Sequence, residues 1–134
     1  MLAGIHHVAI IASDYQRSKR FYTHVLGCQI VDENYRPERD SYKLDLAIPG
    51  GGQIELFSFP DAPERPSRPE AQGLRHLSFK VENLETAISQ LKSHHIEVEP
   101  IRIDPYTQCR FTFFQDPDGL PLELYEIGKS DTSA

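Results

Sequence analysis

A repeated segment constrains the fold of this chain more than any other feature of its sequence. The stretch GIHHVAI at residues 4–10 corresponds to GLRHLSF at residues 73–79, an offset of 69. The correspondence continues through a helical pattern (SDYQRSKRFYTHV, ENLETAISQLKSH) and a strand pair (SYKLDLAIPGGGQIELF, RFTFFQDPDGLPLELYE). The strand pair needs one deletion, which aligns Glu55 with Glu123. The repeat indicates two copies of one supersecondary unit.

Each copy has the pattern βαβββ. Asp14 and Asn83 are suited to cap the two helices, and the turns PGGG and DPDG join the last two strands of each copy. The strands are predicted at 5–11, 29–34, 42–48 and 53–59 in the first copy. In the second copy they are predicted within GLRHLSFKV (73–81) and at 97–101, 110–115 and 122–126. Two such units side by side predict an α+β fold, a curved eight-stranded mixed sheet with helices on its convex face.

A proline-rich segment separates the copies. We predict one domain over residues 1–134, with repeats at about 4–59 and 73–127, a linker at 60–72 and a disordered tail at 128–134. Pro60, Pro63, Pro66 and Pro69 recur at every third position of the linker. The segment fits a stiff, extended connection, and a polyproline ligand for another protein is the alternative.

Composition excludes several classes of function. The formal charge is −6 and there is no basic run, which argues against nucleic acid as a partner. The apolar runs are too short to span a membrane, and no signal peptide is visible, so we expect a cytoplasmic protein. Cys28 and Cys109 are expected to be free thiols.

Alternation along the strands selects four residues of metal-ligand type. Leu77, Phe79 and Val81 form the apolar side of their strand, so His76 faces the opposite, concave side. His7 aligns with His76, whereas His6 aligns with Arg75 and is expected to be structural, on the helix-facing side. The same alternation places Glu55 and Glu123 on the concave face, so the two repeats contribute equivalent His and Glu residues.

These residue types suit a divalent cation. A carboxylate within an apolar strand is costly unless it is paired or bound to a cation, and imidazole with carboxylate makes a good first-row metal site. Four protein ligands on an octahedral ion leave two positions for a substrate with neighbouring oxygens. A lone strand histidine is usually structural and a lone strand glutamate usually solvated. The repeat-equivalent set His7, Glu55, His76 and Glu123 favours a metal site.

At these residues the chain resembles the vicinal oxygen chelate superfamily, which includes glyoxalase I. The motifs are HHVAI with the following helix pattern, IEL, RHLSF and DPDGLPLELYE, and together they cover about residues 4–127. Within the superfamily the chain is most similar to short bacterial glyoxalase-like proteins of the YaeR type. The resemblance implies His7, Glu55, His76 and Glu123 as ligands of Ni, Co, Mn, Fe or Zn, a small-molecule substrate and a homodimer, with the site within one chain or between two.

The resemblance also implies a type of chemistry. Members use the metal as a Lewis acid on a substrate bound through vicinal oxygens, and in glyoxalase-like members a glutamate moves a proton next to a carbonyl. Glu123 or Glu55 would be that catalytic base in a metal-dependent lyase or isomerase. A dioxygenase, a thiol transferase and a protein that sequesters small molecules are the alternatives.

One departure concerns the substrate. Glyoxalase I enzymes commonly carry an arginine and an asparagine where this chain has Ile11 and Phe59, so a smaller or less polar substrate is expected. Strand parity gives the candidate substrate contacts Phe57, Phe59, Ser78, Lys43, Arg110 and Thr112. Arg110 could pair with a substrate carboxylate or phosphate, or it could form a structural salt bridge.

Overall fold

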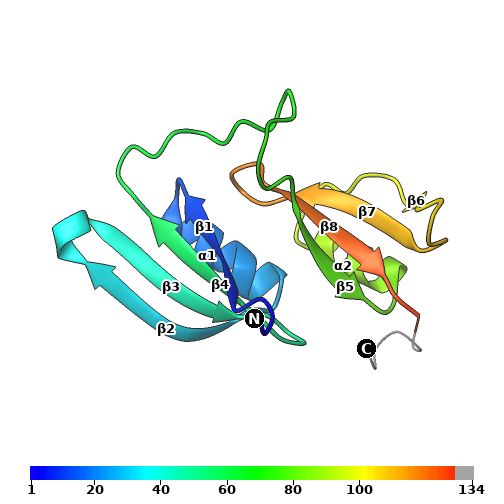
Figure 1. Cartoon of the computed structure of the whole chain (residues 1–134), viewed down its shortest axis with the longest axis horizontal. Helices are drawn as coiled ribbons and strands as arrows, with labels where there is room; N and C mark the ends of the chain where they lie inside the picture. Colours follow the sequence, from blue (N-terminus) through cyan, green and yellow to red (C-terminus); the bar gives the residue numbers. More distant parts are fainter. Residues whose placement is uncertain (129–134) are drawn as a thin grey trace. The chain divides into compact units, whose positions relative to one another are not determined.

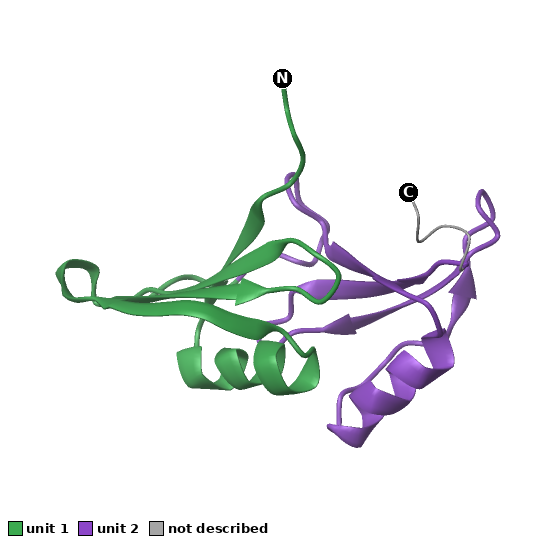
Figure 2. Cartoon of the chain, turned by 90° about the horizontal axis from the view of Figure 1, so that it is seen from below, with its two compact units in different colours: residues 1–64 green, residues 65–134 purple. Residues whose placement is uncertain are grey.

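Each repeat forms its own four-stranded mixed sheet with the same strand order. The computed structural model describes residues 1–128 and divides the chain into two units, residues 1–64 and residues 65–134 (Figures 1 and 2). The orders are β1-β4-β3-β2 and β5-β8-β7-β6, with β1–β4 and β5–β8 parallel and the other pairs antiparallel. The predicted α+β fold of two βαβββ units is confirmed. Of the tail predicted at 128–134, residues 129–134 lie outside the described part of the chain.

The first unit begins its helix where the sequence predicted. The Asp14 side chain accepts a hydrogen bond from the Arg17 backbone N–H at 3.1 Å, which satisfies a donor of the first helical turn. The elements are β1 (His7–Ala12), α1 (Tyr15–Arg20), a π-helical turn (Phe21–Val25), β2 (Gln29–Arg36), a 3₁₀ turn (Pro37–Arg39), β3 (Ser41–Ala47) and β4 (Gln53–Ser58).

The second unit repeats this order with a shorter edge strand. Asn83 caps the helix by accepting from the Thr86 N–H at 2.9 Å. The elements are β5 (Leu77–Val81), α2 (Leu84–Ser93), β6 (Arg102–Ile103), β7 (Arg110–Gln115) and β8 (Pro121–Glu126). The strand predicted at 97–101 is replaced by the two-residue β6. Pro100 has no backbone N–H to donate to a ladder, and regular pairing starts only after it.

The buried core of each unit lies between its helix and one face of its sheet (Figure 2). Leu44, Leu46, Ile54 and Leu56 are fully buried in the first unit, and Leu84, Leu91, Phe114, Leu122 and Leu124 are buried in the second. Alternation along the strands therefore leaves the other face of each sheet free for polar side chains. No helix of residues 1–128 is long and apolar enough to cross a membrane.

Candidate metal centre

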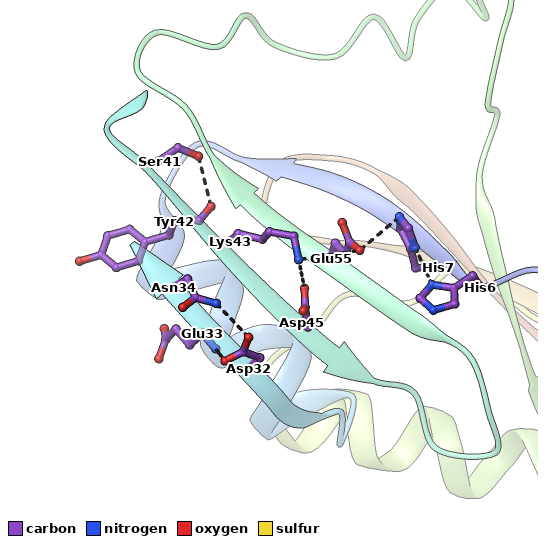
Figure 3. Close-up of polar contacts among 10 residues, drawn as sticks. All are labelled: His6, His7, Asp32, Glu33, Asn34, Ser41, Tyr42, Lys43, Asp45 and Glu55. Carbon is purple, nitrogen blue, oxygen red and sulfur yellow. Dashed lines mark hydrogen bonds and ion pairs between the residues drawn. The ribbon is translucent and has the colours of Figure 1, made fainter. Parts of the chain in front are cut away.

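The first His–Glu pair lies on the sheet face that the helix leaves uncovered. Ala9 is opposite Glu55 in the parallel pairing of β1 with β4, so His7 projects to the same face two residues earlier. The His7 Nε2 lies 3.3 Å from the Glu55 Oε2 (Figure 3), and the side chains are 37% and 15% exposed. The carboxylate is largely withdrawn from water, and the imidazole beside it remains accessible.

The second pair repeats this arrangement in the other unit. Ser78 is opposite Glu123 in the parallel pairing of β5 with β8, and His76 projects to the same face from the residue just before β5. The His76 Nε2 lies 3.5 Å from the Glu123 Oε1, with side chains 25% and 12% exposed. The strand pairing therefore places each His on the same sheet face as its Glu, as the alternation along the strands predicted.

The donor separations within the pairs fit a shared cation. Two ligands that each lie about 2.1 Å from a metal are about 3.0 Å apart at a right angle and about 3.4 Å apart at a tetrahedral angle. The two observed separations are 3.3 Å and 3.5 Å. No group of three or more His, Cys, Asp or Glu side chains that could hold a metal is gathered among residues 1–128. Each unit thus presents two donors of a suitable kind.

His6 is placed differently from the sequence expectation. It was predicted on the helix-facing side, but it is exposed, and its Nδ1 lies 2.8 Å from the Nδ1 of His7 (Figure 3). One ring nitrogen of His7 therefore faces Glu55 and the other faces His6. A histidine that binds a metal through one nitrogen usually has a hydrogen-bond partner at the other. His6 can orient His7, a role that the sequence pattern did not reveal.

Glu55 has a charged neighbourhood. The Lys43 amine lies 2.7 Å from the Asp45 carboxylate and 3.9 Å from that of Glu55 (Figure 3). The hydrogen bond to Asp45 raises the pKa of the Lys43 amine, so this amine carries a positive charge at neutral pH. Lys43 lies opposite Phe57, and Asp45 lies opposite Glu55, so all four share one face of the sheet.

Glu123 has an aromatic neighbourhood instead. Phe113 lies opposite Glu123, and Phe111 lies opposite Tyr125, which makes them the equivalents of Asp45 and Lys43. The Phe113 ring meets the His76 ring edge-on at 5.0 Å between centroids. The two repeat-equivalent glutamates are therefore surrounded by different chemistry, although the strand order around them is the same.

The predicted contacts Arg110 and Thr112 lie on the opposite face of their sheet. Residues paired across antiparallel strands project to the same face, so Phe111 and Phe113, not Arg110 and Thr112, accompany Glu123. The Thr112 hydroxyl is buried and donates to the Glu99 carbonyl at 2.6 Å. Alternation along β7 alone predicted the wrong face, because it does not show which β8 residue lies opposite each β7 residue.

Arg110 forms the structural ion pair that the sequence left as an alternative. Its guanidinium donates two hydrogen bonds to Glu85 of α2, at 2.6 and 2.8 Å, and two to Glu126 of β8, at 2.9 and 2.8 Å. Glu126 also accepts from the Leu84 backbone N–H at 2.9 Å. This network fastens the start of α2 to its sheet, and it holds the Arg110 side chain between two carboxylates.

The other predicted contacts share the faces of the His–Glu pairs. Ser78 is exposed opposite Glu123, and Phe57 and Phe59 are stacked with centroids 5.8 Å apart. The Arg36 guanidinium lies over both rings, at 5.1 and 5.7 Å. Ile11, which is 52% exposed, lies opposite Phe57. The surface beside His7 and Glu55 is apolar at Ile11 and Phe59, as expected, but a guanidinium covers the rings.

Similarity to known proteins identifies the class of protein. Residues 4–124 match the Glyoxalase/Bleomycin resistance protein/Dioxygenase superfamily. The protein YaeR of Escherichia coli is 62% identical over 125 residues, which are 93% of this chain and 97% of YaeR. The crystal structure of a glyoxalase family protein from Enterococcus faecalis is 53% identical, with a TM-score of 0.86, and the match covers 92% of this chain and 98% of that one.

A relative with a named activity is also similar. The lactoylglutathione lyase of Salmonella typhimurium is 30% identical over 130 residues, and the match covers 90% of each chain. The chain belongs to the Glyoxalase/Bleomycin resistance protein/Dioxygenase superfamily, which confirms the resemblance drawn from its motifs.

Proposed function

We propose that this chain is a divalent-metal-dependent, glyoxalase-like lyase or isomerase that acts on a small metabolite with vicinal oxygens. The observation that carries the proposal is the repeat-equivalent occurrence of two His–Glu pairs, with donor separations of 3.3 and 3.5 Å. We assign His7, Glu55, His76 and Glu123 as the metal ligands. A bound Ni, Zn, Co, Mn or Fe ion would supply Lewis-acid assistance to a substrate carbonyl.

We assign Glu123 as the residue that moves the proton. Each glutamate faces its own histidine, at 3.3 and 3.5 Å, but Glu55 also lies 3.9 Å from the charged Lys43 amine, whereas Arg75 acts on Glu123 only through longer-range attraction. A carboxylate without a close ammonium or guanidinium partner is freer to turn toward a substrate carbon and to accept its proton. Glu55 would remain in place as a ligand, and Phe57, Phe59 and Ser78 would contact the substrate.

Membership in the superfamily and the likeness to a lactoylglutathione lyase support this class of reaction. The apolar Ile11 and Phe59 favour a substrate other than the glutathione adduct of that relative. We further propose that the chain acts in the cytoplasm as a homodimer, which light scattering after size-exclusion chromatography would test. A monomer at micromolar concentration would contradict the dimer.

Metal analysis of protein purified without added metal is the first test. We expect bound divalent metal, and we expect Glu123→Gln and Glu55→Gln to weaken its affinity about tenfold or more, because each removes an anionic ligand. Glu97→Gln is the matched control, since Glu97 is exposed in the same unit as Glu123 and belongs to neither pair. Equal metal affinity in Glu97→Gln and Glu123→Gln would contradict the ligand set.

Proton transfer is the second test. Metal-loaded protein in D₂O would be screened with hemithioacetals of a 2-oxoaldehyde, formed with glutathione and with a smaller thiol, and hydrogen exchange at the carbon next to the carbonyl would be followed by NMR. We expect exchange in the native protein and none in Glu123→Gln. Full activity of Glu123→Gln or of metal-free protein would overturn the proposal. Oxygen uptake with Fe(II) and a catechol would indicate a dioxygenase, and tight ligand binding without metal would indicate a sequestering protein.

A further inference from the structure

A cavity of about 600 Å³ lies beside the second His–Glu pair, entirely within the second unit. One part of its lining is the sheet face that carries Phe111, Phe113 and Glu123. The other part is the segment at residues 65–76, which contains the second half of the predicted proline-rich linker. That segment therefore does more than connect the repeats, because its side chains line a cavity next to His76.

Four guanidinium groups line this cavity, together with three carboxylates. The arginines are Arg65, Arg68, Arg75 and Arg102, and the carboxylates are Glu70, Glu99 and Glu123. Arg75 is paired with Glu70, and Arg102 is paired with Glu99 at 3.1 Å. Glu123 faces His76. Two of the four arginines are therefore paired with carboxylates of the lining.

Arg65 and Arg68 have no such partner among residues 1–128. Arg65 is half-buried and donates to neutral acceptors only, the Ser67 hydroxyl at 2.6 Å and the Leu74 carbonyl at 3.4 Å. Arg68 makes no hydrogen bond or ion pair with a described residue, and it acts on Glu70 only through longer-range attraction. The cavity therefore has two guanidinium groups that form no ion pair with a described residue, in a chain whose net charge is −6.

We infer that the substrate carries an anionic group, a carboxylate or a phosphate, which Arg65 and Arg68 bind. The planar guanidinium matches both anions through paired N–H donors, and it cannot lose its charge at physiological pH. Phe111 and Phe113 also line the cavity, with the Arg102 guanidinium over both rings at 5.1 and 5.4 Å, so rings and guanidinium together would contact the carbon skeleton of the same molecule. This inference rests on the proposed function for the identity of the ligand as a substrate.

Anion binding by metal-free protein tests the inference apart from the metal chemistry. Isothermal titration would measure the dissociation constants of inorganic phosphate and malonate, with the uncharged 1,3-propanediol for comparison. We expect one of the two anions to bind and the diol not to bind. Loss of a charge-assisted hydrogen bond in Arg68→Gln should raise the dissociation constant of that anion about tenfold. The tighter of the two anions identifies the group as a phosphate or a carboxylate.

Arg20→Gln is the matched control. Arg20 is exposed on α1 in the other unit, and Arg20→Gln has the same net charge as Arg68→Gln. The dissociation constant of the anion for Arg20→Gln should stay within twofold of the native value. Arg65→Gln should resemble Arg68→Gln, and the exposed position of Arg68 keeps the test valid if the Arg65 variant does not fold. Equal effects of Arg68→Gln and Arg20→Gln, or no anion binding by the native protein, would overturn the inference. Anion binding that depends on Arg68 in a protein without metal affinity would refute the proposed metal chemistry and leave the anion site standing.

Discussion

Replacement of Glu126 by glutamine should destabilise the protein without affecting its metal or ligand sites. The Glu126 carboxylate accepts three hydrogen bonds, two from Arg110 and one from the Leu84 N–H at the start of α2. Hydrogen bonds to a charged group contribute about 1.5–3 kcal/mol. The glutamine keeps the shape and part of the bonding, and the carboxylate is 21% exposed, so water screens some of the attraction. We expect a loss of about 1–2 kcal/mol at pH 7.

That loss corresponds to a measurable shift in melting temperature. Unfolding entropy is about 2.1 cal/mol/K per residue, which for 134 residues gives a shift of about 4–7 °C. Urea denaturation at pH 7, followed by circular dichroism, would measure the free energy of unfolding directly. Metal affinity should be unchanged, because Glu126 lies on the helix-facing side of β8.

The pH dependence gives an independent check of the same contact. The hydrogen bonds from Arg110 and from the Leu84 N–H hold the pKa of the Glu126 carboxyl below its ordinary value of 4.5. A lowered pKa in the folded state contributes stability that is fully present above the unfolded value and is lost as the pH falls through the folded value. The difference in stability between the native protein and Glu126→Gln should therefore shrink below pH 4.5. Equal stability of the two proteins at pH 7, or a constant difference down to pH 3, would refute this account of the network.

Three further predictions follow from other contacts. Thr112→Val should lower the free energy of unfolding by about 1 kcal/mol, because it removes the hydrogen bond from the buried Thr112 hydroxyl to the Glu99 carbonyl. Anion binding should be unchanged; a stable variant that binds anions weakly would place Thr112 on the other face of the sheet. His6→Ala should weaken metal affinity about tenfold in a chelator competition assay, since His7 loses the hydrogen-bond partner of its Nδ1. Replacement of the exposed His24 by alanine is the control and should leave metal affinity unchanged. Equal effects of the two substitutions would show that His6 does not orient His7. Burial raises the pKa of the Cys28 thiol to about 11. A thiol reagent at pH 8 should therefore label the partly exposed Cys109 and leave Cys28 unmodified. Rapid labelling of a Cys109→Ser protein would contradict this prediction.

The sequence alone determined the repeat, the order of elements and the sheet face that each His shares with its Glu. Each depends on local patterns, since a helix cap such as Asp14 or Asn83 acts within one turn and alternation along a strand assigns its faces. Because the βαβββ unit is duplicated, each of these patterns occurs twice, and the two copies can be compared. This is why the sequence resolves the His6–His7 doublet into one candidate ligand, His7.

Register and side-chain contact were decided only by the tertiary structure. Arg110 and Thr112 lie on the face opposite to the predicted one. The β8 partner of each β7 residue depends on the register between the two strands, and the pattern of a single strand does not contain that register. The contact between His6 and His7, and the arginines that the proline-rich segment brings to the cavity beside His76, depend on backbone paths outside regular elements. Periodicity describes helices and strands, and it carries no information about where an irregular segment places its side chains.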